Sequence, residues 1–228
     1  MNSHSVPSSS AGTELLARLV ERLPNGLTLL YGTAADRIAS LYPEEHAGIV
    51  RAVQSRRSEY STGRWLARQG LAALGVPAQA IPSGSAREPI WPAGIVGSLT
   101  HSSSVCAVVL GLAADYRGVG LDLELAEPPQ TELADIILSS TEAREHCSPQ
   151  ALRLVFSAKE SVYKCIYPIC RTFLDFRDVD VRIDHAHSTF SAESGHDKAS
   201  SIELGRGLFE IGERGVATLF TMPAQAFA

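Results

Sequence analysis

The chain has 228 residues, of which 45% are hydrophobic, so it is long and apolar enough to bury a sizeable core. Its formal net charge of −5 argues against a protein whose main ligand is nucleic acid or an anionic membrane surface. It has no apolar run near the ~20 residues that cross a bilayer, no charged start followed by an apolar signal core, and no metal-site or disulfide spacing among its cysteines. We therefore expect a cytoplasmic monomer with reduced thiols at Cys106, Cys147, Cys165 and Cys170.

The first elements can be predicted in chain order. Residues 1–12 are small and polar, so we expect a flexible tail there. Residues 56–74 have apolar side chains at helical intervals and are followed by a glycine and a proline, which predicts a helix. Three short apolar runs, at 94–101, 104–112 and 118–124, are predicted to be buried strands.

Two helix starts follow these strands. Ser139 and Glu142 have the spacing of a capping box, and Ser148-Pro149 supplies a cap and a first-turn proline. The second of these helices should end near Tyr167, because the proline after it restricts the preceding residue. Residues 201–222 combine turn residues with short β-branched runs, as hairpins do.

Strands and helices therefore occur in both parts of the chain, which predicts an α/β (α+β) fold. The junction falls near residues 113–118. We expect an N-terminal half at 13–115 and a C-terminal half at 116–228.

The strand at 118–124 contains two carboxylates that need an explanation. Asp122 and Glu124 are two positions apart, so on an extended strand they point to the same side, while Val119, Leu121 and Leu123 point to the other. Two adjacent carboxylates suit a hard cation. The alternative, favoured when the pair is taken alone, is an edge strand with acids on its solvated face.

The later helix adds a third carboxylate and an ammonium. Glu160 and Lys164 are four residues apart and share one helical face. Three acids and a lysine fit a magnesium site that handles phosphate. The alternative is an ordinary exposed ion pair, which contributes only about 0.3–0.5 kcal/mol.

Together these segments resemble a known family. GVGLDLE at 118–124 and FSAKESVYK at 156–164 are similar to the two signature motifs of the 4′-phosphopantetheinyl transferases, in particular the surfactin-type branch that includes enterobactin synthase component D. The resemblance extends to RRSEYSTGRWLARQGLAALG, REPIWP and GSLTHSSS, and covers roughly residues 50 to 180.

The resemblance implies a fold and a reaction. The fold would be two similar α/β halves related by pseudo-twofold symmetry, with coenzyme A (CoA) and a metal in the cleft between them. The reaction would transfer phosphopantetheine from CoA to a serine of an apo acyl or peptidyl carrier protein, leaving adenosine 3′,5′-bisphosphate. Such carriers serve fatty-acid, polyketide, nonribosomal-peptide and siderophore synthesis.

The resemblance also implies roles for individual residues. Asp122, Glu124 and Glu160 would hold Mg2+, with Mn2+ as an alternative. Lys164 would lie near the reacting phosphate, and Lys159 would also face the CoA site. Glu160 is our candidate for the base that activates the serine, because a free hydroxyl is a weak nucleophile.

Basic residues upstream would bind the rest of CoA. By resemblance, Arg56, Arg64 and Arg87 would contact the adenosine phosphates and His101 a CoA phosphate. Arginine's planar fork suits such contacts. The alternatives are a solvated arginine face and an ordinary loop histidine.

Two other functions remain open from the sequence. A metal-dependent phosphodiesterase would favour a Glu-x-Lys pair on the strand and a basic surface, and residues 121–125 contain no lysine. A non-catalytic module that binds CoA or a carrier protein would not need the three acids and Lys164 together.

Overall fold

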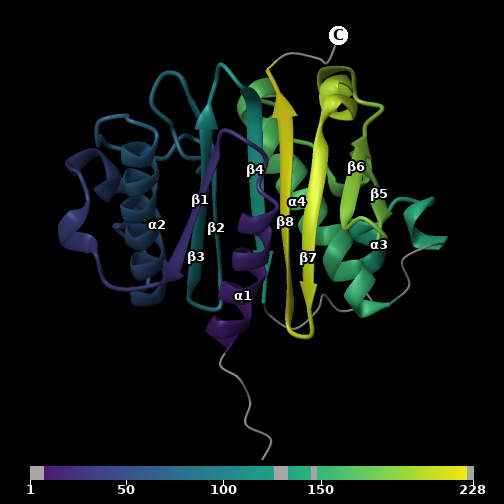
Figure 1. Ribbon diagram of the computed structural model, residues 1–228, viewed down its shortest axis with the longest axis horizontal. Coiled ribbons are helices and arrows are strands. Elements are labelled where there is room, and N and C mark those ends of the chain that lie inside the picture. The colour runs from purple at the N-terminus through teal and green to yellow at the C-terminus, as the bar shows by residue number, and fades with distance from the viewer. Residues whose placement is uncertain (1–7, 126–132, 145–147, 225–228) are drawn as a thin grey trace, which may run out of the picture.

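The structure is a computed structural model that describes residues 8–125, 133–144 and 148–224. In this part of the chain two antiparallel sheets lie side by side, one with three strands in the order β1-β3-β2 and one with five in the order β4-β8-β7-β6-β5 (Figure 1). The elements are α1 (Ser8–Glu21), β1 (Leu27–Thr33), α2 (Gln54–Ala73), β2 (Ile95–Ser102), β3 (Val105–Leu112), β4 (Tyr116–Glu124), α3 (Ala134–Ile137), α4 (Pro149–Cys170), β5 (Asp180–Asp184), β6 (Thr189–Glu193), β7 (Arg206–Gly212) and β8 (Gly215–Pro223).

The two sheets are built from the same chain order. In the first, a strand (β1) and a helix (α2) precede a hairpin (β2-β3), and the first strand pairs with the last. In the second, β4 and α4 precede the hairpin β7-β8, β4 pairs with β8, and β5-β6 are an insertion. This repeat confirms the predicted mixed fold with two similar halves. The sheets divide between Leu112 and Tyr116.

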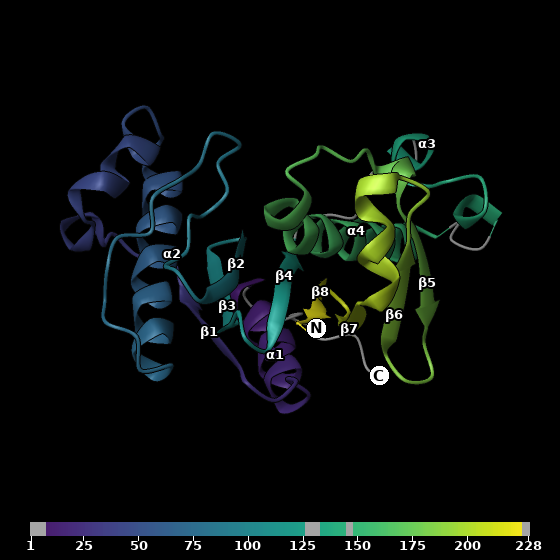
Figure 2. The same cartoon turned by 90° about the horizontal axis from the view of Figure 1, so that it is seen from above.

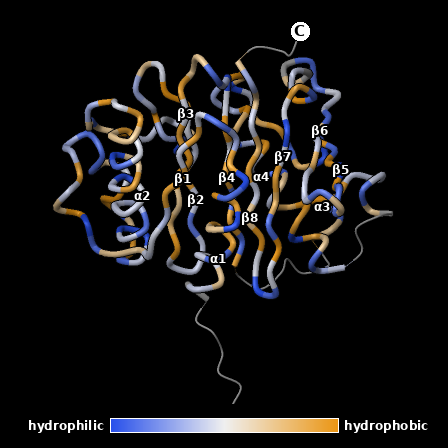
Figure 3. Tube along the Cα trace, in the orientation of Figure 1, coloured by the Kyte–Doolittle hydropathy of each residue, from blue (hydrophilic) through white to orange (hydrophobic). Residues whose placement is uncertain are grey.

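The second sheet is covered on both faces. Figure 2 shows α1 and α4 on opposite sides of β8. Val216, Phe220 and Met222 belong to the core beneath α4, whereas Ala217 and Leu219 belong to the core beneath α1. Much of the hydrophobic colour in Figure 3 accordingly runs along the strands. Alternate strand residues therefore pack against different helices.

The predicted tail is corrected in part. Residues 1–7 lie outside the described residues, but α1 begins at Ser8, so residues 8–12 are helical rather than a flexible tail. Leu15, Leu16 and Leu19 are fully buried or nearly so, and they provide the reason. Burial of this apolar face against the second sheet stabilises a helix whose first turn has only small polar residues.

The helix predictions for α2 and α4 are confirmed except at one end. Ser148 caps α4 through its Oγ, which accepts from Ala151 N at 3.1 Å. The helix runs to Cys170 with Pro168 inside it, so the predicted end near Tyr167 is wrong. Pro168 has no N–H and so removes one hydrogen bond, but it lies in the last turn, where little of the helix follows it. Arg171 closes the helix with φ of 51°.

The halves meet where β2 runs beside β4. Hydroxyls on alternate residues of β2 take the place of strand pairing: Ser98 Oγ accepts from Leu121 N, and Ser102 Oγ accepts from Leu125 N, both at 3.0 Å. Thr100, between the two serines, donates to Asp122 Oδ1 at 3.5 Å. None of the helices in the described part of the chain is long and apolar enough to span a bilayer.

Candidate active site

The site begins with the close approach of α4 to β4. Gly118 and Gly120 are on the same face of β4 as Asp122 and Glu124. A Cβ on Gly120 would overlap the carbonyl oxygen of Ser161, so any larger residue there would push the helix away. The motif therefore combines two glycines that admit the helix with two acids that the helix then covers.

Asp122 is held in place from several sides. Its side chain is almost fully buried, its Oδ2 accepts from Ser157 Oγ at 2.8 Å, and its Oδ1 accepts from Lys164 Nζ at 2.5 Å. Ser157 in turn shares a hydrogen bond with Thr218 Oγ1 at 3.0 Å. The alternative of acids on a solvated edge is thus wrong for Asp122, because α4 and β2 cover it.

Three acids and one ammonium influence one another. Burial, followed by the charge of Asp122, raises the pKa of Glu124 to about 7. Burial also raises the pKa of Glu160, although Lys164 opposes it. Burial alone would lower the pKa of Lys164, but Asp122, Glu160 and Glu124 together raise it. The ionisation of Glu124 and Glu160 therefore depends on the charges of Asp122 and Lys164 as well as on burial.

These residues fit a divalent cation by their chemistry. Carboxylate oxygens are the ligands that Mg2+ and Mn2+ prefer, and the pKa values of Glu124 and Glu160 are raised chiefly by burial, which a bound cation would offset. Their side chains are not closed around one point: within the described residues no three His, Cys, Asp or Glu side chains are grouped so that they could hold a metal ion. The ammonium of Lys164 instead forms an ion pair with Oδ1 of Asp122.

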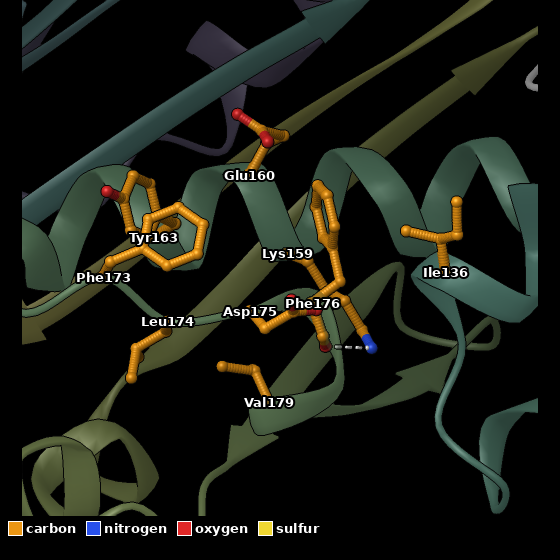
Figure 4. Close-up of a pocket in the computed structure, with 9 residues that line it drawn as sticks. All are labelled: Ile136, Lys159, Glu160, Tyr163, Phe173, Leu174, Asp175, Phe176 and Val179. Atoms are coloured by element: carbon orange, nitrogen blue, oxygen red, sulfur yellow. Dashed lines mark hydrogen bonds between the residues drawn. The ribbon is translucent and has the colours of Figure 1, made fainter.

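Lys159 does not point toward the predicted CoA site. Its Nζ donates to Ile137 O at 2.8 Å, to Glu142 Oε2 at 2.6 Å and to Phe176 O at 2.8 Å, which uses all three of its hydrogens. Figure 4 shows Lys159 and Glu160 leaving α4 on opposite sides. In this arrangement the ammonium of Lys159 is directed to Glu142 and away from Glu160, because neighbouring helical residues point about 100° apart.

An apolar cavity of about 270 Å³ lies beside Glu160 (Figure 4). Phe173, 74% exposed, stands over Tyr163 with 6.0 Å between ring centroids. No motif pointed to residues 173–179, whose sequence FLDFRDV mixes apolar and charged residues. The lining residues are Ile136, Lys159, Glu160, Tyr163, Phe173, Leu174, Asp175, Phe176 and Val179.

A second cavity, of about 220 Å³, lies between the two halves. Arg87 and Trp91 line it from the first half, and Glu160, Tyr163 and Lys164 line it from the second. The structure thus brings Arg87 together with two residues of the acid and lysine cluster. Glu160 lines both cavities and lies where they adjoin.

Arg56 and His101 form a separate basic pair. The guanidinium of Arg56 contacts Nε2 of His101, and Glu59 Oε2 lies 3.5 Å from Arg56 Nη1 and 3.2 Å from His101 Nδ1. Burial and the charge of Arg56 lower the pKa of His101. Lys164 and Asp122 also act on this pKa, which places His101 within electrostatic range of the acid cluster.

Arg64 is placed differently from the prediction. It is buried, its Nε donates to Ile81 O and its Nη2 to Ser83 Oγ, each at 3.1 Å. Its guanidinium stacks 3.8 Å over the Tyr60 ring. Arg64 therefore anchors residues 81–83 to α2 through Nε and Nη2. The sequence did not reveal this, because the acceptors lie in a loop without a motif.

The amino-acid sequence matches one family of known proteins. Two family models match, the 4'-phosphopantetheinyl transferase N-terminal domain over residues 44–111 and the 4'-phosphopantetheinyl transferase superfamily over residues 118–219. The 4'-phosphopantetheinyl transferase Svp of Streptomyces mobaraensis is 38% identical over 166 residues, which cover 69% of this chain and 67% of Svp. The corresponding transferase Npt of Nocardia iowensis is 33% identical over 180 residues, or 74% of this chain and 72% of Npt. Enterobactin synthase component D of Salmonella typhi is 37% identical over 132 residues, or 54% of each chain. The chain therefore belongs to the 4′-phosphopantetheinyl transferase superfamily.

Proposed function

We propose that the protein transfers the 4′-phosphopantetheine group of CoA to a serine hydroxyl of an apo acyl or peptidyl carrier protein. A serine oxygen–phosphorus bond forms, the phosphorus–oxygen bond within the CoA diphosphate breaks, and adenosine 3′,5′-bisphosphate leaves. The observation that carries the proposal is the cluster of Asp122, Glu124, Glu160 and Lys164, which adjoins a cavity between the two halves.

The ammonium of Lys164 is positioned to stabilise negative charge on the diphosphate of CoA. Its ammonium is held at Asp122 by a 2.5 Å ion pair and lines the cavity between the halves. We propose that Asp122, Glu124 and Glu160 hold Mg2+, or alternatively Mn2+, which when bound supplies charge neutralisation for the diphosphate. In-line attack then requires that the serine be held opposite the leaving oxygen.

Glu160 is the proposed general base. It lines both cavities, so a serine entering the site and the arm of CoA can both reach it. Burial raises its pKa toward the working pH, which is the condition for an efficient base. Glu160 would take the proton that the serine hydroxyl loses.

Different parts of the protein are proposed to bind the phosphates of CoA and its pantetheine arm. We propose that Arg56, Arg87 and His101 bind the adenosine phosphates, since all three are at least partly exposed on the first half. The apolar cavity of about 270 Å³ suits the pantetheine arm. We propose that Lys159 and Arg64 act indirectly in this arrangement, because Lys159 Nζ has three protein acceptors and Arg64 donates to Ile81 O and Ser83 Oγ.

We also propose that the protein acts as a monomer in the cytoplasm. One chain supplies both halves and the whole acid cluster. Cys106, Cys165 and Cys170 are free thiols, which suits a reducing compartment. Cys147 lies outside the described residues.

The test is the intact mass of an apo carrier protein after incubation with this protein, CoA and Mg2+. We expect a gain of one phosphopantetheine group, which disappears with a chelator and in the Glu160→Ala variant. A folded protein that binds CoA but modifies none of several acyl and peptidyl carriers would support the non-catalytic binding module instead.

A further inference from the structure

An ion pair joins the two halves at the rim of the cavity between them. Arg171 Nη1 lies 2.6 Å from Glu88 Oε1. Glu88 belongs to the loop between α2 and β2, whereas Arg171 follows α4. The Glu88 side chain is only 12% exposed, compared with 61% for Arg171, and Glu88 itself lines the cavity. The pair therefore links the loop that lines the cavity from the first half to the residue that follows α4, which lines the cavity from the second half.

Both partners are held by their own backbone. Glu88 Oε2 accepts from Ala86 N at 3.0 Å, and Glu88 O accepts from Gly84 N at 2.7 Å, which closes the loop into a tight turn. Within that turn Arg87 has φ of 68°. Arg171 is fixed by its N–H, which donates to Tyr167 O at 2.8 Å. Because little backbone freedom is lost when the pair forms, it can contribute more than a typical exposed ion pair.

The halves also meet along β2 and β4, through the hydroxyls of Ser98, Thr100 and Ser102, and they share a hydrophobic core to which α1, β1, β3, β4 and β8 contribute. Those contacts use side chains, with no main-chain ladder between the two sheets in the described residues. Residues 81–83 are anchored to α2 by Arg64 of the same half. The ion pair of Glu88 with Arg171 adds a charged contact from the second half, next to Arg87.

We infer that Glu88 and Arg171 form a strap that holds the loop carrying Arg87 against the cavity, and that both act as positioning residues for CoA. The inference rests on the proposed function for the identity of the ligand. The strap itself does not depend on that identity.

The first experiment measures amide hydrogen exchange over residues 83–90 in the absence of CoA. The variants are Arg171→Met, Glu88→Gln and the double variant. Glu88→Gln keeps a side-chain oxygen that can accept from Ala86 N, so it removes only the charge. Arg182→Met is the matched control, because Arg182 pairs with Glu193 at 2.9 Å on the exposed edge strand of the second sheet. We expect faster exchange in the three strap variants and wild-type exchange in the control. Unchanged exchange in Arg171→Met would overturn the strap.

The second experiment measures the Kd for CoA by calorimetry and kcat at saturating CoA. We expect the Kd to rise about two- to fivefold in each single variant, with no further loss in the double variant. The kcat should stay at the wild-type value, and Arg171→Lys should recover most of the affinity. Additive losses, or a fall in kcat as large as that in kcat/KM, would overturn the positioning role. If the wild-type protein does not bind CoA, the proposed function fails, and the exchange data alone decide whether the strap exists.

Discussion

The ammonium of Lys159 and the carboxylate of Glu142 form a 2.6 Å salt bridge in which both side chains are almost completely buried, at 2% and 3% exposure. Glu142 also accepts from Ser139 N through Oε2 at 2.8 Å and from Val181 N through Oε1 at 2.7 Å. The pair thus ties α4 to the segments before and after it. Two of those segments carry Ile136 and Phe176, which line the apolar cavity.

We predict that Lys159→Met destabilises the protein by about 3–5 kcal/mol, because it leaves a buried carboxylate without its counter-charge. Urea unfolding measures the effect. The double variant with Glu142→Gln should lose less than the sum of the two single variants, because the neutral pair no longer buries an isolated charge. If Lys159→Met instead unfolded at the wild-type urea midpoint but lost CoA binding, the ammonium would have to contact the ligand.

The second prediction concerns Gly120, against which α4 lies. Gly120→Ala places a methyl group against the carbonyl oxygen of Ser161, so we expect a loss of about 1–3 kcal/mol in unfolding free energy together with lower transfer activity. The activity should fall because Asp122 and Lys164 lie on the two elements forced apart. Gly32→Ala in β1 is the matched control, since a Cβ there has no heavy atom within 4 Å. Equal stabilities of the two variants would show that α4 can shift without cost.

The acid and lysine cluster was predictable because its members lie on regular elements. Period two on β4 and period 3.6 on α4 place Asp122 with Glu124, and Glu160 with Lys164, whatever the rest of the fold. Neither periodicity shows that β4 and α4 face each other. That expectation came from resemblance to a family, and Gly118 and Gly120 provide the physical reason.

The sequence did not reveal a side chain's contacts where its partner lies far away in the chain. Lys159 pairs with Glu142, whose only sequence signal was a capping box, and Arg64 bonds to loop residues near Ile81. Local patterns give the direction of a side chain but not the group it meets. The helix α1 was not predicted, because its stability comes from burial against β7 and β8, which no local pattern records.

The third prediction uses the lowered pKa of His101. Burial and the charge of Arg56 lower it below the ordinary 6.5, while Glu59 and Asp122 oppose the shift and Lys164 adds to it. The unfolded chain therefore takes up a proton before the folded protein does, so stability is present above pH 6.5 and is lost as the pH falls below it. We expect the Tm of the wild type to fall more steeply between pH 6.5 and 5 than that of His101→Gln. Parallel Tm curves for the two proteins would contradict the shift.

The last prediction concerns Glu124, whose pKa is raised to about 7 by burial and then by Asp122. The folded protein holds this proton more tightly than the unfolded chain, so the contribution to stability is present below the ordinary value of 4.5 and is lost as the pH rises through 7. A divalent cation needs the ionised carboxylate and competes with the proton. Mg2+ should therefore raise the Tm more at pH 8 than at pH 5.5, and chelation should reverse the gain. The Glu124→Gln variant should show a smaller gain with a weaker dependence on pH, because only Glu160 then has a raised pKa. A gain in Tm that is equal at both pH values in the wild type would exclude Glu124 from the cation site.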